Sequence, residues 1–64
     1  MKNHIKKLRK ERKVTQEDFA IALDVSRQTI VAIENEKYNP SLELTFKMAR
    51  YFEVTIEEMF DYDE

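Results

Sequence analysis

The sequence predicts an all-α fold of five short helices, and residues 1–64 are expected to form one domain. Apolar residues recur at helical spacing throughout the chain. Ser or Thr stands before four of these apolar runs, where a helix N-cap is expected. Glycine and cysteine are both absent, so neither a flexible linker nor a disulfide framework is indicated. A domain of 64 residues is close to the smallest that a hydrophobic core alone can stabilise.

The first helix is expected to run from residue 3 or 4 to Arg12, with Ile5 on its apolar side. Arg9 follows Ile5 by four residues, so its side chain lies on or beside the buried stripe. A guanidinium group in that position needs an acidic partner, and Glu34 is the best candidate. We therefore expect a structural ion pair between Arg9 and Glu34, in preference to a binding role for Arg9.

Residues 15–37 are expected to form two short capped helices joined by a tight turn. Thr15 caps the first of these two helices, and Asp18 three residues later makes a variant of the capping box. Asp24 and Val25 form the turn, and Ser26 caps the second helix. The residues expected to face inward are Phe19, Ala20 and Leu23 on the first of these helices and Ile30 and Ile33 on the second.

The outward face of the second of these helices carries no carboxylate. It is expected to expose Arg27, Gln28, Val31, Ala32 and Asn35 to water. Arg and Gln at the exposed N-terminal end of a short helix suit the edges of bases in a DNA major groove. The pattern therefore predicts a helix-turn-helix that binds double-stranded DNA.

The C-terminal half of the chain is expected to contain two more helices. A loop precedes Pro40, because the residue before a proline disfavours helical conformation, and Ser41 then caps a fourth helix. The expected inner face of the fourth helix consists of Leu42, Thr45, Met48, Ala49 and Phe52. Thr55 and Glu58 form a T-x-x-E capping box for a short fifth helix. Its apolar members are Ile56, Met59 and Phe60.

The tail, residues 60–64, alternates apolar and acidic residues, a pattern typical of a short β-strand. Such a strand needs a partner to pair with, and the chain's own N-terminus is one option. The predicted fold class is therefore an all-α, five-helix domain, to which a short pair of terminal β-strands can be added.

Charge is distributed unevenly along the chain, although the net charge is only −2. Residues 1–13 carry seven Lys and Arg residues against one Glu, whereas residues 53–64 carry six acidic residues and no basic one. This asymmetry fits a dipolar molecule with one face for phosphate and another kept away from it. A solvated helix and a charged tail that serve solubility are the alternative, and charge alone does not decide between the two.

Four segments, LRKERKVTQEDFA, LDVSRQTI, AIENEKYNPSLEL and FEVTIEEMF, resemble in this order the Cro/CI-type (xenobiotic-response-element) helix-turn-helix repressors of phages and bacteria. The resemblance covers nearly the whole chain, is strongest to the small free-standing members, and implies their five-helix fold and DNA binding. Two positions depart from the family pattern: Asp24 and Glu36 stand where the family commonly has Gly. Asp tolerates a left-handed backbone, whereas Glu36 also brings a carboxylate near the expected phosphate path.

Four residues are expected to contact the bases of DNA. Arg27 is suited to a bidentate contact with guanine and Gln28 to one with adenine, and a phosphate contact is the alternative for Arg27. Val31 and Ala32 are small and apolar on an exposed face, which contact with a thymine methyl group would explain. The resemblance implies DNA contacts at Gln16, Arg27, Gln28, Ala32 and Asn35.

The remaining contacts are expected to hold the DNA backbone and carry no sequence information. Gln16 can meet a phosphate with its side chain and its backbone N–H at a helix N-terminus. Backbone contacts are also expected from Thr29, Asn35, Lys37, Tyr38 and Asn39. For Lys37 and Tyr38 an ordinary loop role is an equal alternative.

The sequence thus predicts a sequence-specific transcription regulator, with repression as the expected effect, that binds a palindromic operator as a homodimer. Large apolar groups are concentrated near the C-terminus beyond what so small a domain can easily bury. The expected dimer interface consists of Ile56, Met59, Phe60 and Tyr62. A protein-interaction module, antitoxin-like or adaptor, that uses the tail is the alternative function.

Other classes of function have little support in the sequence. There is no cysteine, the one histidine, His4, is near the terminus, and no glycine loop could cradle a phosphate, so we expect no enzyme, metal site, cofactor or small-molecule substrate. No apolar run approaches membrane-spanning length, and no signal peptide is recognised. A reducing cytoplasm is the expected location.

Overall fold

The computed structural model describes residues 1–62, which contain five α-helices and two short β-strands. In chain order these are β1 (Lys2–Asn3), α1 (Ile5–Glu11), α2 (Gln16–Leu23), α3 (Arg27–Glu34), α4 (Leu42–Phe52), α5 (Ile56–Met59) and β2 (Phe60–Asp61). The predicted five-helix fold is confirmed, and the tail does form a strand with the N-terminus. The part of the expected strand at Asp63 and Glu64 lies outside the described residues.

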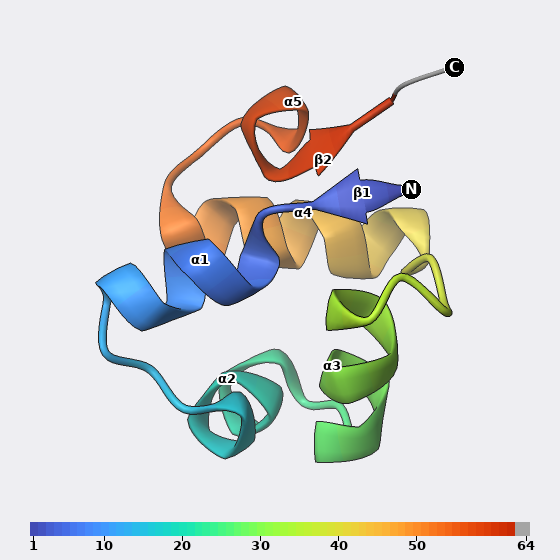
Figure 1. Ribbon diagram of the computed structural model, residues 1–64. Helices are drawn as coiled ribbons and strands as arrows, with labels where there is room; N and C mark the ends of the chain where they lie inside the picture. Colours follow the sequence, from blue (N-terminus) through green and yellow to red (C-terminus); the bar gives the residue numbers. More distant parts are fainter. Residues whose placement is uncertain (63–64) are drawn as a thin grey trace.

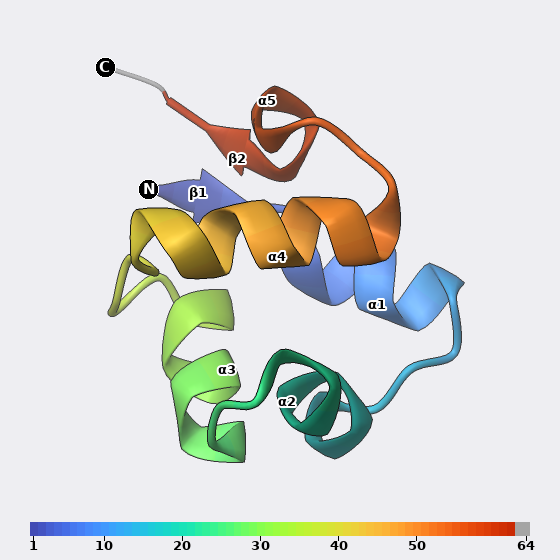
Figure 2. The same ribbon diagram turned by 180° about the vertical axis from the view of Figure 1, so that it is seen from behind.

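The helices are arranged in tiers (Figures 1 and 2). α2 and α3 lie together at one end of the molecule, α1 and α4 occupy the middle, and α5 lies with the two strands at the opposite end. The most extensive contact between helices joins α2 to α3. No helix among the described residues has the length and apolarity needed to cross a membrane.

The two ends of the chain meet in a small antiparallel sheet. Lys2 pairs with Asp61, and Asn3 pairs with Phe60. The sheet explains why α1 begins at Ile5, slightly later than expected, since the preceding residues are drawn into β1.

The four N-cap hydroxyl groups predicted from the sequence are all present, but among the described residues the Asp18 carboxylate does not complete the capping box expected at Thr15. The hydroxyl groups of Thr15, Ser26, Ser41 and Thr55 each accept a hydrogen bond from the backbone N–H three residues later. At Thr55 the capping box is complete, because Glu58 also accepts a 2.8 Å hydrogen bond from the Thr55 backbone N–H. This backbone bond, followed by the Thr55 side chain, holds the pKa of Glu58 below its ordinary value of 4.5. The contribution of the box to stability is therefore present above that ordinary value and is lost as the pH falls below it.

A single core is built from all five helices. Its fully buried large side chains are Phe19, Phe52, Ile5, Ile30, Ile33, Met48 and Met59. One expectation for α4 was wrong: Leu42 is 71% exposed, and Leu44 is buried in its place. Leu42 lies about 90° around the helix from the middle of the buried stripe, at the edge of the face that packs on the core.

Four of the described residues, none of them glycine, adopt the left-handed backbone conformation. They are Lys13, Asp24, Glu36 and Glu53, with φ between 58° and 63°. Asp24 and Glu53 form the C-caps of α2 and α4, and Glu36 lies just beyond α3. A side chain with a Cβ atom raises the energy of this conformation, so the glycine-free chain ends its helices under mild strain.

Replacing either glutamate by glycine should relieve this strain. We expect Glu36→Gly and Glu53→Gly each to raise the free energy of unfolding by about 0.5–1 kcal/mol in urea titrations. Ala22→Gly, in the exposed interior of α2, is the control and should lower it by about 1 kcal/mol. Two glutamate variants no more stable than Ala22→Gly would contradict the assignment of strain.

Candidate nucleic-acid interface

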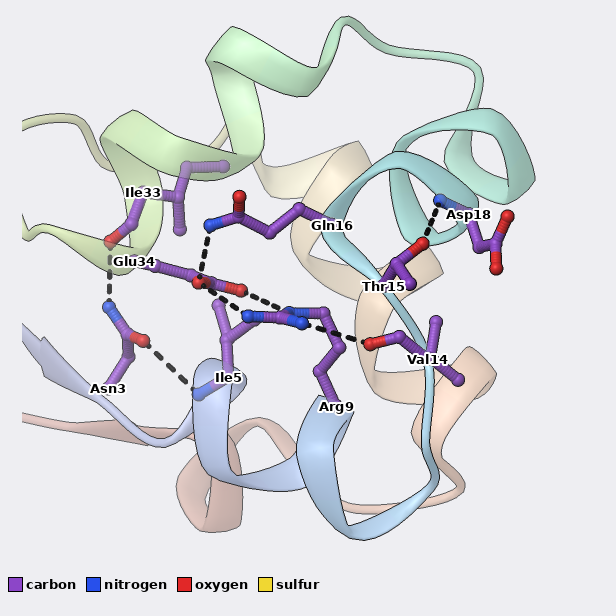
Figure 3. Close-up of polar contacts among 9 residues, drawn as sticks. All are labelled: Asn3, Ile5, Arg9, Val14, Thr15, Gln16, Asp18, Ile33 and Glu34. Atoms are coloured by element: carbon purple, nitrogen blue, oxygen red, sulfur yellow. Dashed lines mark hydrogen bonds and ion pairs between the residues drawn. The ribbon is translucent and has the colours of Figure 1, made fainter.

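A buried ion pair joins α1 to α3 (Figure 3). The Nε atom of Arg9 donates to Oε2 of Glu34 at 2.8 Å, and Nη2 donates to Oε1 at 3.2 Å. The two side chains are only 9% and 2% exposed. The remaining nitrogen, Nη1, donates to the carbonyl oxygen of Val14 at 2.9 Å. This is the pair expected from the sequence, and it satisfies most of the hydrogen-bonding capacity of the guanidinium group.

Gln16 belongs to the same network. Its Nε2 donates to Oε1 of Glu34 at 3.1 Å, so the start of α2 is attached to the end of α3 (Figure 3). The sequence suggested a phosphate contact for this side chain. The bond to Glu34 uses one of the two N–H donors of its amide group, and the backbone N–H of Gln16 lies at the N-terminus of α2.

The starts of α2 and α3 enclose a polar hollow at the surface. It is lined by Arg9, Thr15, Gln16, Glu17 and Arg27. Arg27 is exposed and is the first residue of α3. The structure therefore brings Gln16 and Arg27, eleven positions apart in the sequence, to the same feature of the surface.

The outward face of α3 is more varied than the sequence suggested. Arg27, Gln28 and Asn35 are exposed as expected, but Val31 and Ala32 are half-buried, because they lie at the edge where α3 packs on the core. Thr29 is half-buried as well, and the Glu34 side chain is buried and turned toward Arg9 (Figure 3). No described residue of α3 therefore presents a free carboxylate on the outward face.

Thr29 takes part in the cap of α3. Its backbone N–H donates to the Ser26 hydroxyl group at 3.1 Å, and the two hydroxyl oxygens are 2.9 Å apart. In the loop after α3, Lys37, Tyr38 and Asn39 are exposed. Asn39 also lines a separate, mostly apolar hollow with Leu42 and Tyr62. It therefore lies between the α2–α3 surface and the α4–α5 surface.

Two residues that the sequence analysis passed over hold the helices in place. Asn3 donates from Nδ2 to the carbonyl oxygen of Ile33 at 2.9 Å, across 30 positions of the chain. Arg12 donates from Nη2 to the carbonyl oxygen of Phe52 at 2.8 Å, and its guanidinium carbon lies 5.2 Å from the centre of that ring. Neither contact follows a local pattern, so no signal in the sequence could have identified it.

The dimer interface expected from the sequence needs a correction. Met59 is fully buried and Phe60 is only 7% exposed, because both complete the core of their own domain. Met59 therefore offers no surface to a second chain, and Phe60 offers only the small part that lines a surface hollow beside Ile56 and Tyr62. Ile56 is half-buried and Tyr62 is 81% exposed, so these two remain at the surface.

Comparison with known proteins identifies the family. A family model described as helix-turn-helix matches residues 5–59. The chain belongs to the Cro/CI-type helix-turn-helix family. It is 55% identical over 64 residues to an uncharacterized HTH-type transcriptional regulator of Methanocaldococcus jannaschii, covering 100% of this chain and 97% of the relative.

Two further comparisons agree with this assignment. A cryptic phage CTXphi transcriptional repressor of Vibrio cholerae is 35% identical over 60 residues, covering 94% of this chain and 54% of that protein. The crystal structure of a restriction-modification controller protein of Aeromonas hydrophila matches with a TM-score of 0.78 at 25% identity, covering 88% of this chain and 85% of that one. The chain is therefore a DNA-binding helix-turn-helix transcriptional regulator.

Breaking the Arg9–Glu34 pair should strongly destabilise this regulator. We expect Arg9→Met to lower the free energy of unfolding by about 3–5 kcal/mol, because Glu34 is left charged and buried. The exposed Arg27→Met is the matched control and should change it by less than about 0.5 kcal/mol. Urea titration followed by circular dichroism measures both, and equal effects would contradict a special role for the pair.

Proposed function

We propose that this regulator recognises its operator by placing α3 in the major groove, with Gln28 and Ala32 at the edges of the bases. The observation that carries the proposal is the charge of the outward face of α3. Glu34, the one carboxylate of that helix, is bound by Arg9 and Gln16 and points inward. The exposed amide of Gln28 can therefore approach DNA without a neighbouring carboxylate on its own helix.

We assign the remaining contacts to the sugar–phosphate backbone. Arg27 shares a hollow with Gln16 at the start of α2, and this placement favours a phosphate contact over the alternative contact with guanine. Gln16 can donate to the same phosphate from its second amide N–H and from its backbone N–H at the helix N-terminus. The other proposed backbone contacts are Thr29, Asn35, Lys37, Tyr38 and Asn39.

The two classes of contact should respond differently to substitution. Gln28→Ala should relax base preference at one operator position and cost about 1–3 kcal/mol there. Arg27→Ala and Lys37→Ala should each weaken binding to all sequences alike and reduce the salt slope by about one. Selection from random DNA, followed by fluorescence anisotropy at several salt concentrations, separates these outcomes. A Gln28→Ala variant with unchanged affinity and base preference would exclude α3 as the reading element.

A homodimer is the proposed DNA-binding form, and the outer side of α4 and α5 is the proposed interface. Leu42, Phe46 and Tyr62 are 71%, 49% and 81% exposed. Two shallow hollows, one containing Leu42 and Tyr62 and the other Phe46, share the residues Ile56 and Glu57. The exposed apolar groups therefore form one continuous face, and such faces commonly mark interfaces.

Charge on this face suits a second copy of the same chain. Arg50 and Glu57 line the hollow around Phe46. A two-fold axis through the face would set the cation of each chain against the carboxylate of the other. α5 lies at the end of the molecule opposite α2, so such a dimer leaves the α2–α3 surface free (Figures 1 and 2).

A dimer of this kind would require a palindromic operator with half-sites about 34–36 Å apart. Repression is the proposed effect, supported by the similarity to the Vibrio cholerae phage repressor. The alternative of a protein-interaction module that uses the tail is weaker than the sequence suggested, because Phe60 belongs to the core.

The interface can be tested by introducing charge into it. We expect Leu42→Glu and Phe46→Glu to sediment as monomers at concentrations where the wild type is a dimer, because two carboxylates would face each other across the axis. Ile21→Glu is the control, since Ile21 is 70% exposed but lies on α2. Dimers of both α4 variants, or a monomeric wild type at high micromolar concentration, would overturn this interface.

A further inference from the structure

We infer that Asn3 is a positioning residue that fixes the recognition helix α3 relative to the dimer face and thereby sets the spacing of the two operator half-sites. The inference rests on the proposed function. Asn3 lies in β1 and is half-buried. Its Nδ2 donates to the carbonyl oxygen of Ile33 at 2.9 Å, and its Oδ1 accepts from the Ile5 backbone N–H at 3.2 Å (Figure 3).

The bond to Ile33 reaches the last turn of α3. The carbonyl oxygen of Ile33 also accepts a 3.0 Å hydrogen bond from the backbone N–H of Glu36, so both of its lone pairs are used. Glu36 is in the left-handed conformation, where the chain leaves α3 for the loop of Lys37 and Tyr38. Asn3 therefore holds the point at which the recognition helix ends and the proposed phosphate-contacting loop begins.

On its other side, Asn3 is tied to the proposed dimer face. It pairs with Phe60 in the terminal sheet, and Met1 and Tyr62, at the outer ends of the two strands, both line the apolar hollow of that face. Within residues 1–62, no other hydrogen bond joins the two strands to α3. The Asn3 side chain is thus the polar link between the face that would meet the second chain and the helix that would enter DNA.

This link bears on operator spacing. In a two-fold dimer, the separation and relative rotation of the two recognition helices depend on how firmly each is fixed to the interface. Shifting one half-site by a single base pair moves it about 3.4 Å along the duplex and rotates it by about a tenth of a turn. A dimer in which α3 is held firmly should bind the shifted operator weakly. A dimer in which α3 can move should bind the shifted operator almost as tightly as the original one.

The test uses the full chain and a set of duplexes in which the half-sites of the selected operator are moved apart or together by one and two base pairs. We expect wild-type affinity to fall about tenfold or more for a one-base-pair shift, and that of Asn3→Asp to fall by about threefold or less. Asn3→Asp keeps an oxygen for the Ile5 N–H but cannot donate to Ile33. Its affinity for an isolated half-site should stay within about twofold of wild type, which general unfolding would not allow.

A matched control lies on the same sheet. Asp61→Asn alters the carboxylate that lies 3.1 Å from His4 Nε2 and that, within residues 1–62, makes no hydrogen bond or ion pair with α3, so it should retain the wild-type spacing profile. Should Asn3→Asp not fold, Asn3→Ser serves instead, because its hydroxyl can accept from Ile5 but is too short to reach Ile33.

The outcomes separate this inference from the function on which it rests. A sharp spacing optimum in the wild type that Asn3→Asp or Asn3→Ser retains would overturn the role of Asn3 and leave the proposed function standing. An equally broadened profile for Asp61→Asn would also overturn it, because loosening of the sheet in general would then be the cause. A wild-type chain that selects no DNA sequence would overturn the proposed function and this inference together.

Discussion

The buried ion pair of Arg9 and Glu34 is the interaction on which the rest of the structure depends. It joins the first helix to the third, and through Gln16 it also fixes the start of the second. A guanidinium group 9% exposed and a carboxylate 2% exposed are stable only while each is bound by the other. The same pair removes the one carboxylate of α3 from the surface proposed to meet DNA. The Arg9–Glu34 pair is therefore required both for the packing of the helices and for the proposed binding of DNA.

The size of the domain imposes the second constraint. A chain of 64 residues buries a smaller fraction of its surface than a larger domain does, so each large apolar side chain that reaches the core matters to stability. Met59 and Phe60 close the core from the C-terminal side. Of the apolar groups left outside, Leu42 and Phe46 lie on the outer side of α4, and Ile21 lies on α2. The apolar surface available for association is therefore made by the side chains that the core does not bury.

The ends of α3 and α4 combine a strained backbone conformation with a negative charge. Glutamate occupies the left-handed position after both α3 and α4, although glycine would adopt that conformation with less strain. Glu53 ends α4, whereas Glu36 lies two residues beyond the end of α3. A phosphate held by Lys37, as proposed, would be repelled by the negative charge of Glu36, and this repulsion lowers the electrostatic part of DNA affinity.

The sequence by itself determined the helices and their caps, because a hydroxyl group and an N–H three residues apart interact locally. It also indicated the Arg9–Glu34 pair, since a buried cation requires an acidic partner. Only the tertiary structure decided that Gln16 supports Glu34, that Asn3 reaches Ile33 and that Phe60 is core. These outcomes depend on which surfaces meet when distant segments pack, and periodicity within one helix carries no information about the element that covers it.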